Sequence, residues 1–264
     1  MCLAVDPDLL VTIRAMSMGY VVASDPSDPT SRTTPGTGSD AASQWLTDLR
    51  GVAARTCVVA LPFSQADLTS LARIDRSGLT SATLDTPADV VDAILGVRSV
   101  RGLTIPALGA VDQSGSELLR RSGHPRVLVA GSSVDPTGAP TASGLYNAGG
   151  LQAQTYDSSV SAALGAVGTG PLVTALTPPS QQVDLADESP TSRRQAAVAA
   201  LAFRSIATPG SSAGDGTDAG TATTNTATTN TPVTNTAGRA EVVMPPTYWS
   251  ATADDANALF STAT

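Results

Sequence analysis

Short apolar runs recur along the chain, each ending near proline, glycine or aspartate, and helical patterns separate them. This alternation is typical of βα units around a parallel sheet. The runs are continuous in Val, Ile, Leu and Ala, so both faces of each strand are expected to be buried, as in parallel sheets. The expected strands are Cys2–Val5, Cys57–Leu61, Gly102–Ile105, Val127–Ala130, Leu151–Thr155, Leu172–Ala175 and Glu241–Met244.

Between these runs, apolar residues recur at helical spacing. The expected helices are Pro7–Met18, Ala41–Ala54, Gln65–Arg73, Ala88–Leu95, Ser116–Arg121, Ser158–Val167 and Ser189–Ile206. The pattern predicts an α/β fold class: repeated βα units around a mainly parallel sheet, forming a (β/α) barrel of about seven strands. An incomplete barrel and an open sheet are the alternatives. We expect one barrel-like domain over residues 1–264.

Two stretches break the alternation. Residues 24–40 are rich in Ser, Asp, Pro, Thr and Gly and are expected to form a disordered loop. Residues 208–238 repeat Ala, Thr and Asn with almost no charge or large apolar side chains. Such a segment cannot offset the entropy of ordering, so we predict a low-complexity disordered insertion.

Composition and charge narrow the classes of function. All 15 basic residues are Arg, and the net charge is −8 with no basic cluster beyond two Arg pairs. A phosphate backbone would meet no electropositive surface, so nucleic-acid binding is not expected. No run approaches the ~20 apolar residues of a transmembrane helix. The chain opens directly in an apparent strand, so any signal or anchor is expected outside it, in a longer protein.

The two cysteines occupy matching positions. Cys2 and Cys57 each begin an apolar run that ends in proline. If the two runs are neighbouring parallel strands, the sulfurs approach each other. A disulfide, which would favour an exported protein, and a pair of small buried thiols both fit this pattern.

Carboxylates and aromatic residues gather just after the expected strands. Ligands of parallel α/β folds bind at the carboxyl ends of strands, so these positions are the predicted rim of a site. The expected ligand-binding residues are Asp8, Phe63, Gln65, Asp67, Tyr156, Tyr248 and Trp249. An exposed aromatic ring in such a set would supply a stacking surface for a sugar.

Three carboxylates are the candidates for catalysis. Glycoside hydrolysis needs two carboxyl groups about 5–10 Å apart across a sugar. Asp6 and Asp157 are the leading pair, and Glu188 is the third candidate. The competing interpretation is structural, because each precedes a predicted helix and suits an N-cap or a first turn.

Missing residue types exclude several mechanisms. His124 is the only histidine, and it precedes an expected strand, on the face opposite the predicted site. A His-based triad or a site with two or three imidazoles is therefore not available, and we predict no metal site. The chain has no Lys for a Schiff base or a phosphate clamp, and no cofactor is expected.

The order of segments resembles a family of actinobacterial envelope proteins of unknown function whose genes neighbour the lipid II flippase. The resemblance rests on five segments: residues 3–10, 45–50, 59–68, 194–195 and 243–249. It implies an exported, membrane-anchored protein whose α/β region is similar to the barrels of glycoside hydrolases and polysaccharide deacetylases. The deacetylase metal set of an Asp and two His is not matched here.

These observations lead to one main prediction and two alternatives. We expect an extracytoplasmic cell-envelope module, linked to cell-wall biogenesis, that binds peptidoglycan, another envelope glycan or a membrane protein of precursor export. The first alternative is a glycoside hydrolase that uses Asp6 with Asp157 or Glu188. The second is a structural partner domain of a membrane protein, which a flat apolar surface would favour.

Overall fold

The computed structural model describes residues 1–134, 144–171, 185, 187–206, 230–232, 242–246 and 249–263. These residues divide into two compact units. Unit 1 comprises Met1–Ala107 and Glu117–Arg126, and unit 2 comprises Leu108–Ser116 and Val127–Thr264. The boundary falls within α6 (Gln113–Arg121). Each unit is described by itself, and a single domain over residues 1–264 stays a prediction.

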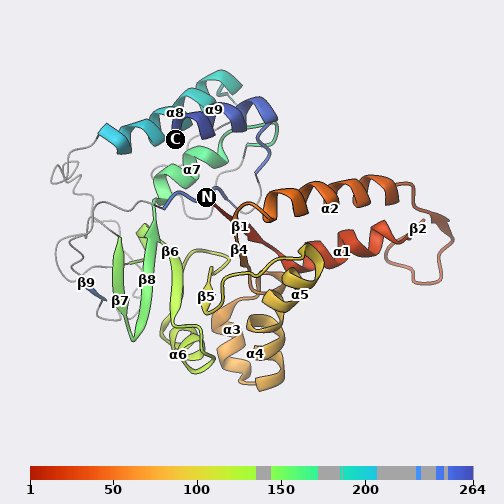
Figure 1. The fold of residues 1–264 in the computed structure, drawn as a ribbon, viewed down its shortest axis with the longest axis horizontal. Coiled ribbons are helices and arrows are strands. Elements are labelled where there is room, and N and C mark those ends of the chain that lie inside the picture. Colours follow the sequence, from red (N-terminus) through yellow and green to blue (C-terminus); the bar gives the residue numbers. More distant parts are fainter. Residues whose placement is uncertain are drawn as a thin grey trace. The chain divides into compact units, whose positions relative to one another are not determined.

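Unit 1 is built on one pair of parallel strands. β1 (Cys2–Val5) pairs in register with β4 (Cys57–Ala60), and an isolated parallel bridge joins Val59 to Val100. The short strand β5 (Leu103–Thr104) follows. The helices of this unit are α1 (Pro7–Ser17), α2 (Ser39–Ala53), α3 (Leu68–Ile74), α4 (Ser77–Leu84) and α5 (Thr86–Leu95), with a 3-10 turn η1 (Phe63–Gln65) (Figure 1).

The core of unit 1 is aliphatic. Leu10 of α1, Leu46 of α2 and Val91 of α5 are buried together against Val5 and Val58 of the two strands. Complete burial of a side chain such as Leu10 stabilises the fold by roughly 1.5–3 kcal/mol. One apolar stripe on each of three helices therefore fixes how these helices pack on the β1–β4 pair.

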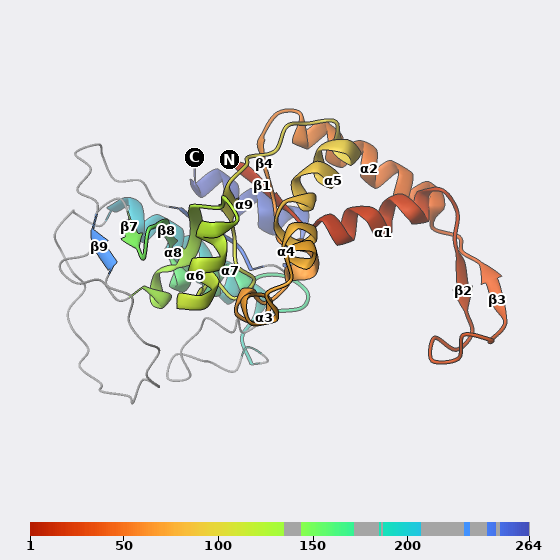
Figure 2. The same cartoon turned by 90° about the horizontal axis from the view of Figure 1, so that it is seen from below.

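A two-stranded antiparallel ribbon extends unit 1. β2 (Val21–Ala23) pairs with β3 (Thr33–Pro35), and the loop between them is held by turns at Asp25 and Asp28. Both views place the ribbon at the end of α1 and α2, away from β1 and β4 (Figures 1 and 2). Residues 24–40, where composition predicted a disordered loop, hold the turns at Asp25 and Asp28, strand β3 and the first residues of α2.

Unit 2 combines a small sheet with the helices α7, α8 and α9. β6 (Arg126–Ala130), β8 (Leu151–Tyr156), β7 (Leu145–Ala148) and β9 (Asn230–Pro232) are neighbours in that order. β7 is antiparallel to both β8 and β9. Gly149 and Gly150 both have positive φ in the tight β7–β8 turn, a conformation that glycine adopts without strain.

The helices of unit 2 share their own core. They are α7 (Ser158–Gly165), α8 (Pro190–Ile206) and α9 (Ala253–Ala263), and a 3-10 turn η2 (Gly131–Ser133) follows β6. Val160, Leu164, Ala197 and Leu259 are buried together, and Trp249 packs against them. This cluster is the main apolar contact among the three helices.

The predicted seven-strand (β/α) barrel is wrong. Within the described residues, the sheets are small: one parallel pair, one antiparallel pair, and one sheet in which β7 is antiparallel to β8 and β9. Continuous apolar runs predict strands buried on both faces, but they do not say how many strands pair; in β1 only Val5 is buried, and Cys2 and Ala4 are exposed. The expected strand Leu172–Ala175 and most of the insertion 208–238 lie outside the described residues; β9 falls within the latter.

Candidate functional site

The loops after β1 and β4 lie at the same edge of the parallel pair in unit 1. Leu61 N–H donates to Val5 C=O at 2.9 Å, which extends the pairing to the ends of both strands. The edge therefore carries Asp6 and Asp8 from the first loop and Phe63, Gln65 and Asp67 from the second, as the sequence predicted for parallel neighbours. What these side chains do there is shown by their hydrogen bonds.

Asp6 and Asp67 each begin a helix. The Asp6 carboxylate accepts the Asp8 N–H at 2.9 Å, and Pro7 fills the first helical position of α1. The Asp67 carboxylate accepts the N–H groups of Thr69 and Ser70 at 3.2 and 3.1 Å. The Ser70 hydroxyl also donates to Asp67, and this bond is the main reason that the pKa of Asp67 lies below its usual 3.8. Both carboxylates thus stabilise helix N-termini.

Asp157 has the same role in unit 2. Its carboxylate accepts the N–H groups of Ser159 and Val160, at 2.8 and 3.1 Å, and begins α7. Glu188 is exposed just before α8, and its backbone C=O accepts a hydrogen bond from Arg193. The geometry therefore supports the competing interpretation, helix capping, for Asp6 and Asp157; for Glu188 it shows only a position just before α8.

The aromatic residues expected at a sugar-binding surface are buried or partly buried where the structure describes them. Tyr156 is only 2% exposed, and burial raises the pKa of its hydroxyl to about 12. Trp249 Nε1–H donates to Leu164 C=O at 2.8 Å, and its ring meets Phe260 edge-on at 6.3 Å between centroids. Phe63 and Gln65 are half-buried, and Tyr248 lies outside the described residues. Tyr156 is therefore closed to stacking on a ligand, and Trp249 is partly buried against the core of unit 2.

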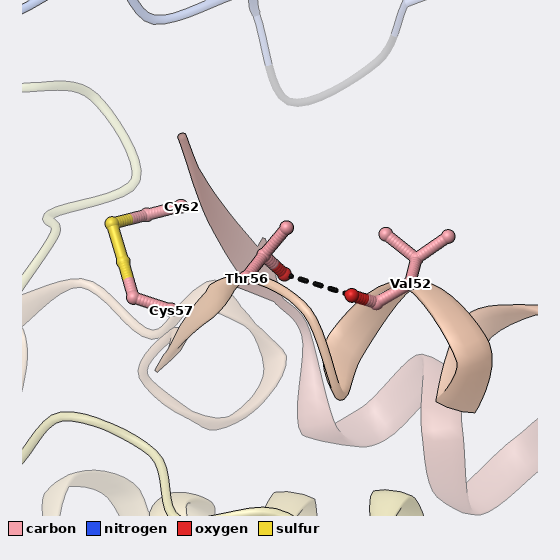
Figure 3. The surroundings of a disulfide bond; sticks show 4 residues. All are labelled: Cys2, Val52, Thr56 and Cys57. Atoms are coloured by element: carbon pink, nitrogen blue, oxygen red, sulfur yellow. Dashed lines mark hydrogen bonds between the residues drawn. A yellow bond between two sulfur atoms is a disulfide. The ribbon is translucent and has the colours of Figure 1, made fainter.

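Cys2 and Cys57 form a disulfide. They are register partners on β1 and β4, with Cα atoms 4.5 Å apart, and close a loop with a sequence separation of 55 (Figure 3). The last turn of α2 leads into β4, where the Thr56 hydroxyl donates to Val52 C=O at 3.1 Å. The disulfide therefore fastens the first strand of the chain to the strand that follows α2.

Sequence reasoning missed a polar pocket in unit 1. The cavity has a volume of about 330 Å³ and includes Asp85, Asp89, Arg101 and His124 in its lining. His124 Nε2 lies 3.2 Å from the Asp85 carboxylate, and His124 Nδ1 lies 3.2 Å from the Thr104 hydroxyl. Nothing in the sequence connects these residues, which come from the α4–α5 junction, β5 and the turn before β6.

This Asp–His–Thr arrangement does not present a nucleophile. Nδ1 of His124 faces the Thr104 hydroxyl and Nε2 faces Asp85, so a nucleophile activated by this ring would have to be Thr104 itself. Thr104 is only 2% exposed, so its hydroxyl is shielded from a ligand in the pocket. With Nε2–H donating to Asp85 and Nδ1 accepting from Thr104, the ring instead links three segments of unit 1.

A second, apolar hollow lies between α1 and α5. It has a volume of about 310 Å³ and is lined by Val11, Arg14 and Ala15 of α1, by Met18 at the C-cap of that helix, and by Val90 and Ala93 of α5. We call this the α1–α5 groove. Of the groove residues, Val11 is 42% exposed and Met18, the C-cap of α1, is 75% exposed, whereas Leu10 of the same helix is fully buried; Leu9, 48% exposed, lies outside the groove. A sequence signal was present, because apolar residues occur on more than one face of α1.

The described residues contain no cluster of three His, Cys, Asp or Glu side chains suited to a metal ion. Among the helices described, none is long and apolar enough to cross a membrane. No protein-family model matches the chain, and no curated protein matches its sequence. The likeness to the actinobacterial envelope family stays a prediction from sequence pattern.

Proposed function

We propose that this chain is an extracytoplasmic module of the cell envelope that binds a protein partner through the α1–α5 groove. The observation that carries the proposal is the groove itself, an apolar hollow whose lining includes the exposed side chains of Val11 and Met18. Contiguous exposed apolar surface commonly marks sites of protein association. A helix or loop of a partner that inserts apolar side chains would remove this surface from water.

Three further observations support this proposal over the alternatives. The Cys2–Cys57 disulfide suits an oxidising compartment, where such bonds persist. The capping roles of Asp6 and Asp157 favour a binding module over a glycoside hydrolase. The burial of Tyr156 and the packing of Trp249 favour a protein partner over a glycan, because ring stacking on a sugar needs an open ring face.

Site-specific photo-crosslinking tests the proposal in cells of the source bacterium. A photoreactive residue replaces Val11, which lines the groove, or Leu79, which is comparably exposed on α4 outside it. We expect a discrete heavier adduct from position 11, lost when Met18→Asp is added, and none from position 79. Equal adducts from both positions, or none from position 11, would overturn the groove as a binding site.

Two measurements separate the parts of the proposal. Alkylation of cell extracts before and after reduction reports whether Cys2 and Cys57 are oxidised in the cell; free thiols would refute the extracytoplasmic location. Co-sedimentation with purified peptidoglycan sacculi tests the glycan alternative. If the sacculi retain the wild type and Val11→Asp to the same extent, the chain binds a glycan and does so outside the groove. That outcome would refute a protein partner in favour of a glycan.

A further inference from the structure

The β2–β3 ribbon is exposed over its whole length. All six residues of β2 and β3 are exposed, and Val21 and Val22 are 64 and 48% exposed. Two-stranded ribbons are marginally stable in water and usually gain a third strand or a covering element. β2 also has none of the charged residues that commonly protect a free strand edge.

The hydrogen-bond pattern of the ribbon shows which backbone groups point outward. Gly36 N–H donates to Tyr20 C=O, and Ser24 N–H donates to Arg32 C=O, both at 2.8 Å. Hydrogen-bonded and non-hydrogen-bonded pairs alternate in an antiparallel ladder. In the observed register, Val21 and Ala23 are therefore non-hydrogen-bonded positions, and their N–H and C=O groups face away from β3.

The outer edges of the two strands are not equivalent. On β3, the outward positions are Thr33 and Pro35, and Pro35 has no N–H to donate. On β2, Val21 and Ala23 each offer a donor and an acceptor. Across the part of the chain that the structure describes, these four groups of β2 have no recorded hydrogen-bond partner. The β2 edge is thus the one able to accept another strand.

We infer that the β2 edge pairs with the β2 edge of a second copy of this chain, in an antiparallel, two-fold symmetric dimer. With the axis at Val22, Val21 of each copy faces Ala23 of the other, and the two pairs form about four hydrogen bonds. The result is a continuous four-stranded sheet, because each β2 remains paired with its own β3.

The charges of the ribbon favour a second copy of this chain as the strand that pairs with the β2 edge. The paired strands contain no charged residue, so no like charges face each other across the axis. The antiparallel arrangement directs the loop of one copy, with Asp25 and Asp28, toward the α1 terminus of the other, which carries Arg14. Arg32 lies in the same loop and leaves it with a net negative charge. The acidic loop also makes the ribbon tip unsuited to insertion into a membrane.

Light scattering with size-exclusion chromatography of the full chain tests the inference first. We expect the dimer fraction of the wild type to rise with protein concentration. Ala23→Pro removes an outward N–H from the β2 edge of each copy, and should weaken dimerisation about tenfold. Thr33→Pro is the matched control, since Thr33 is the register partner of Ala23 but lies on the β3 edge. It should change dimerisation less than about twofold.

Disulfide trapping tests the register. Directly opposed residues in a non-hydrogen-bonded pair have Cα atoms about 4.5 Å apart, within reach of a disulfide. Val22→Cys should therefore give a covalent dimer on mild oxidation, whereas Thr34→Cys, the register partner of Val22 on β3, should not. A monomer at every concentration, a dimer insensitive to Ala23→Pro, or equal trapping by both cysteine variants would overturn the inference. None of these outcomes bears on the α1–α5 groove, because the experiment leaves Val11 and α5 unchanged.

Discussion

Arg194 donates from Nε to Oδ1 of Asp255 at 2.6 Å, and so joins α8 to the first turn of α9. Asp255 is also half of a reciprocal cap. Its Oδ2 accepts the Thr252 N–H at 3.1 Å, and its own N–H donates to the Thr252 hydroxyl at 3.2 Å. A single carboxylate, only 5% exposed, therefore begins one helix and holds another.

Acid should weaken unit 2 through Asp255. Burial acts to raise the pKa of this carboxyl, but hydrogen bonds from Thr252 and Arg194 outweigh burial and hold the pKa below 3.8. The stabilisation is present above the unfolded value of 3.8 and is lost as the pH falls through the lower folded value. Urea unfolding at stepped pH should show this loss below about pH 4.

Asp255→Asn should remove much of that acid sensitivity and lower the free energy of unfolding at neutral pH by about 1–3 kcal/mol. Asp254→Asn is the control, since Asp254 is exposed in the same helical turn. If both variants unfold alike, the Arg194–Asp255 contact does not stabilise unit 2.

Alkali should weaken the same unit through Tyr156. Its pKa is raised from 10.0 to about 12 by burial, so the unfolded chain ionises first as the pH rises. The stability is fully present below pH 10 and falls between 10.0 and about 12. The full loss is roughly 2–3 kcal/mol. Tyr156→Phe keeps the ring and should reduce the fall in the free energy of unfolding at alkaline pH, measured by urea unfolding at stepped pH. If the fall is unchanged in this variant, another group causes it.

Gly109→Ala should destabilise unit 2 by about 1–3 kcal/mol. Gly109 has a φ of +64°, and a Cβ there would collide with the Tyr156 hydroxyl. Gly96→Ala is the matched control, because Gly96 has a φ of +71° but open space around it. Chemical denaturation should rank Gly109→Ala as the costlier variant, and Tyr156→Phe in the same chain should recover part of the difference. Equal costs would show that backbone strain alone is responsible.

Loss of the disulfide should lower the free energy of unfolding of unit 1 by about 2–4 kcal/mol, because the unfolded chain regains the freedom of a long loop. Cys2→Ser with Cys57→Ser tests this in thermal unfolding. Reduction of the wild type should produce a similar shift, and reduction of the double variant none. If reduction leaves the unfolding temperature of the wild type unchanged, the disulfide contributes little to the stability of unit 1.

The His124 link should show energetic coupling. His124→Ala leaves the Thr104 hydroxyl buried without its ring partner, which costs roughly 1–3 kcal/mol. Thr104→Val removes the hydroxyl as well, so the double variant should be less destabilised than the sum of the single changes. A double-mutant cycle by urea unfolding measures this coupling; strict additivity would mean that the 3.2 Å contact contributes nothing.

Local sequence signals predicted the bounds of several helices and strands well, but they did not predict how many strands pair in each sheet. β1 has the expected bounds, and α1, α2 and α7 end within two residues of theirs, because Asp-Pro, apolar stripes and N-cap residues act within a few positions. α9 carries a Thr252-to-Asp255 capping signal that could have been recognised. The number of strands in each sheet depends on contacts between distant segments, which apolar runs alone do not encode.

The residues of the candidate site also fall into those that the sequence predicted and those that it did not. Asp6, Asp67 and Asp157 follow strands and precede helices, so their positions could be read, although position alone could not separate catalysis from capping. The link from Asp85 through His124 to Thr104 spans segments 20 and 39 residues apart. No spacing rule joins such residues, and only the packing of unit 1 brings them together.

The packing of Trp249 gives the chain its own optical reporter. The protein has two tryptophans: Trp249 contacts the core of unit 2, while Trp45 in unit 1 is already 40% exposed. Loss of structure around α7, α8 and α9 should move Trp249 emission to longer wavelength, whereas Trp45 should shift less. In a Trp45→Phe background, fluorescence would report the unfolding of one unit alone, and comparison with circular dichroism would reveal whether the two units unfold together.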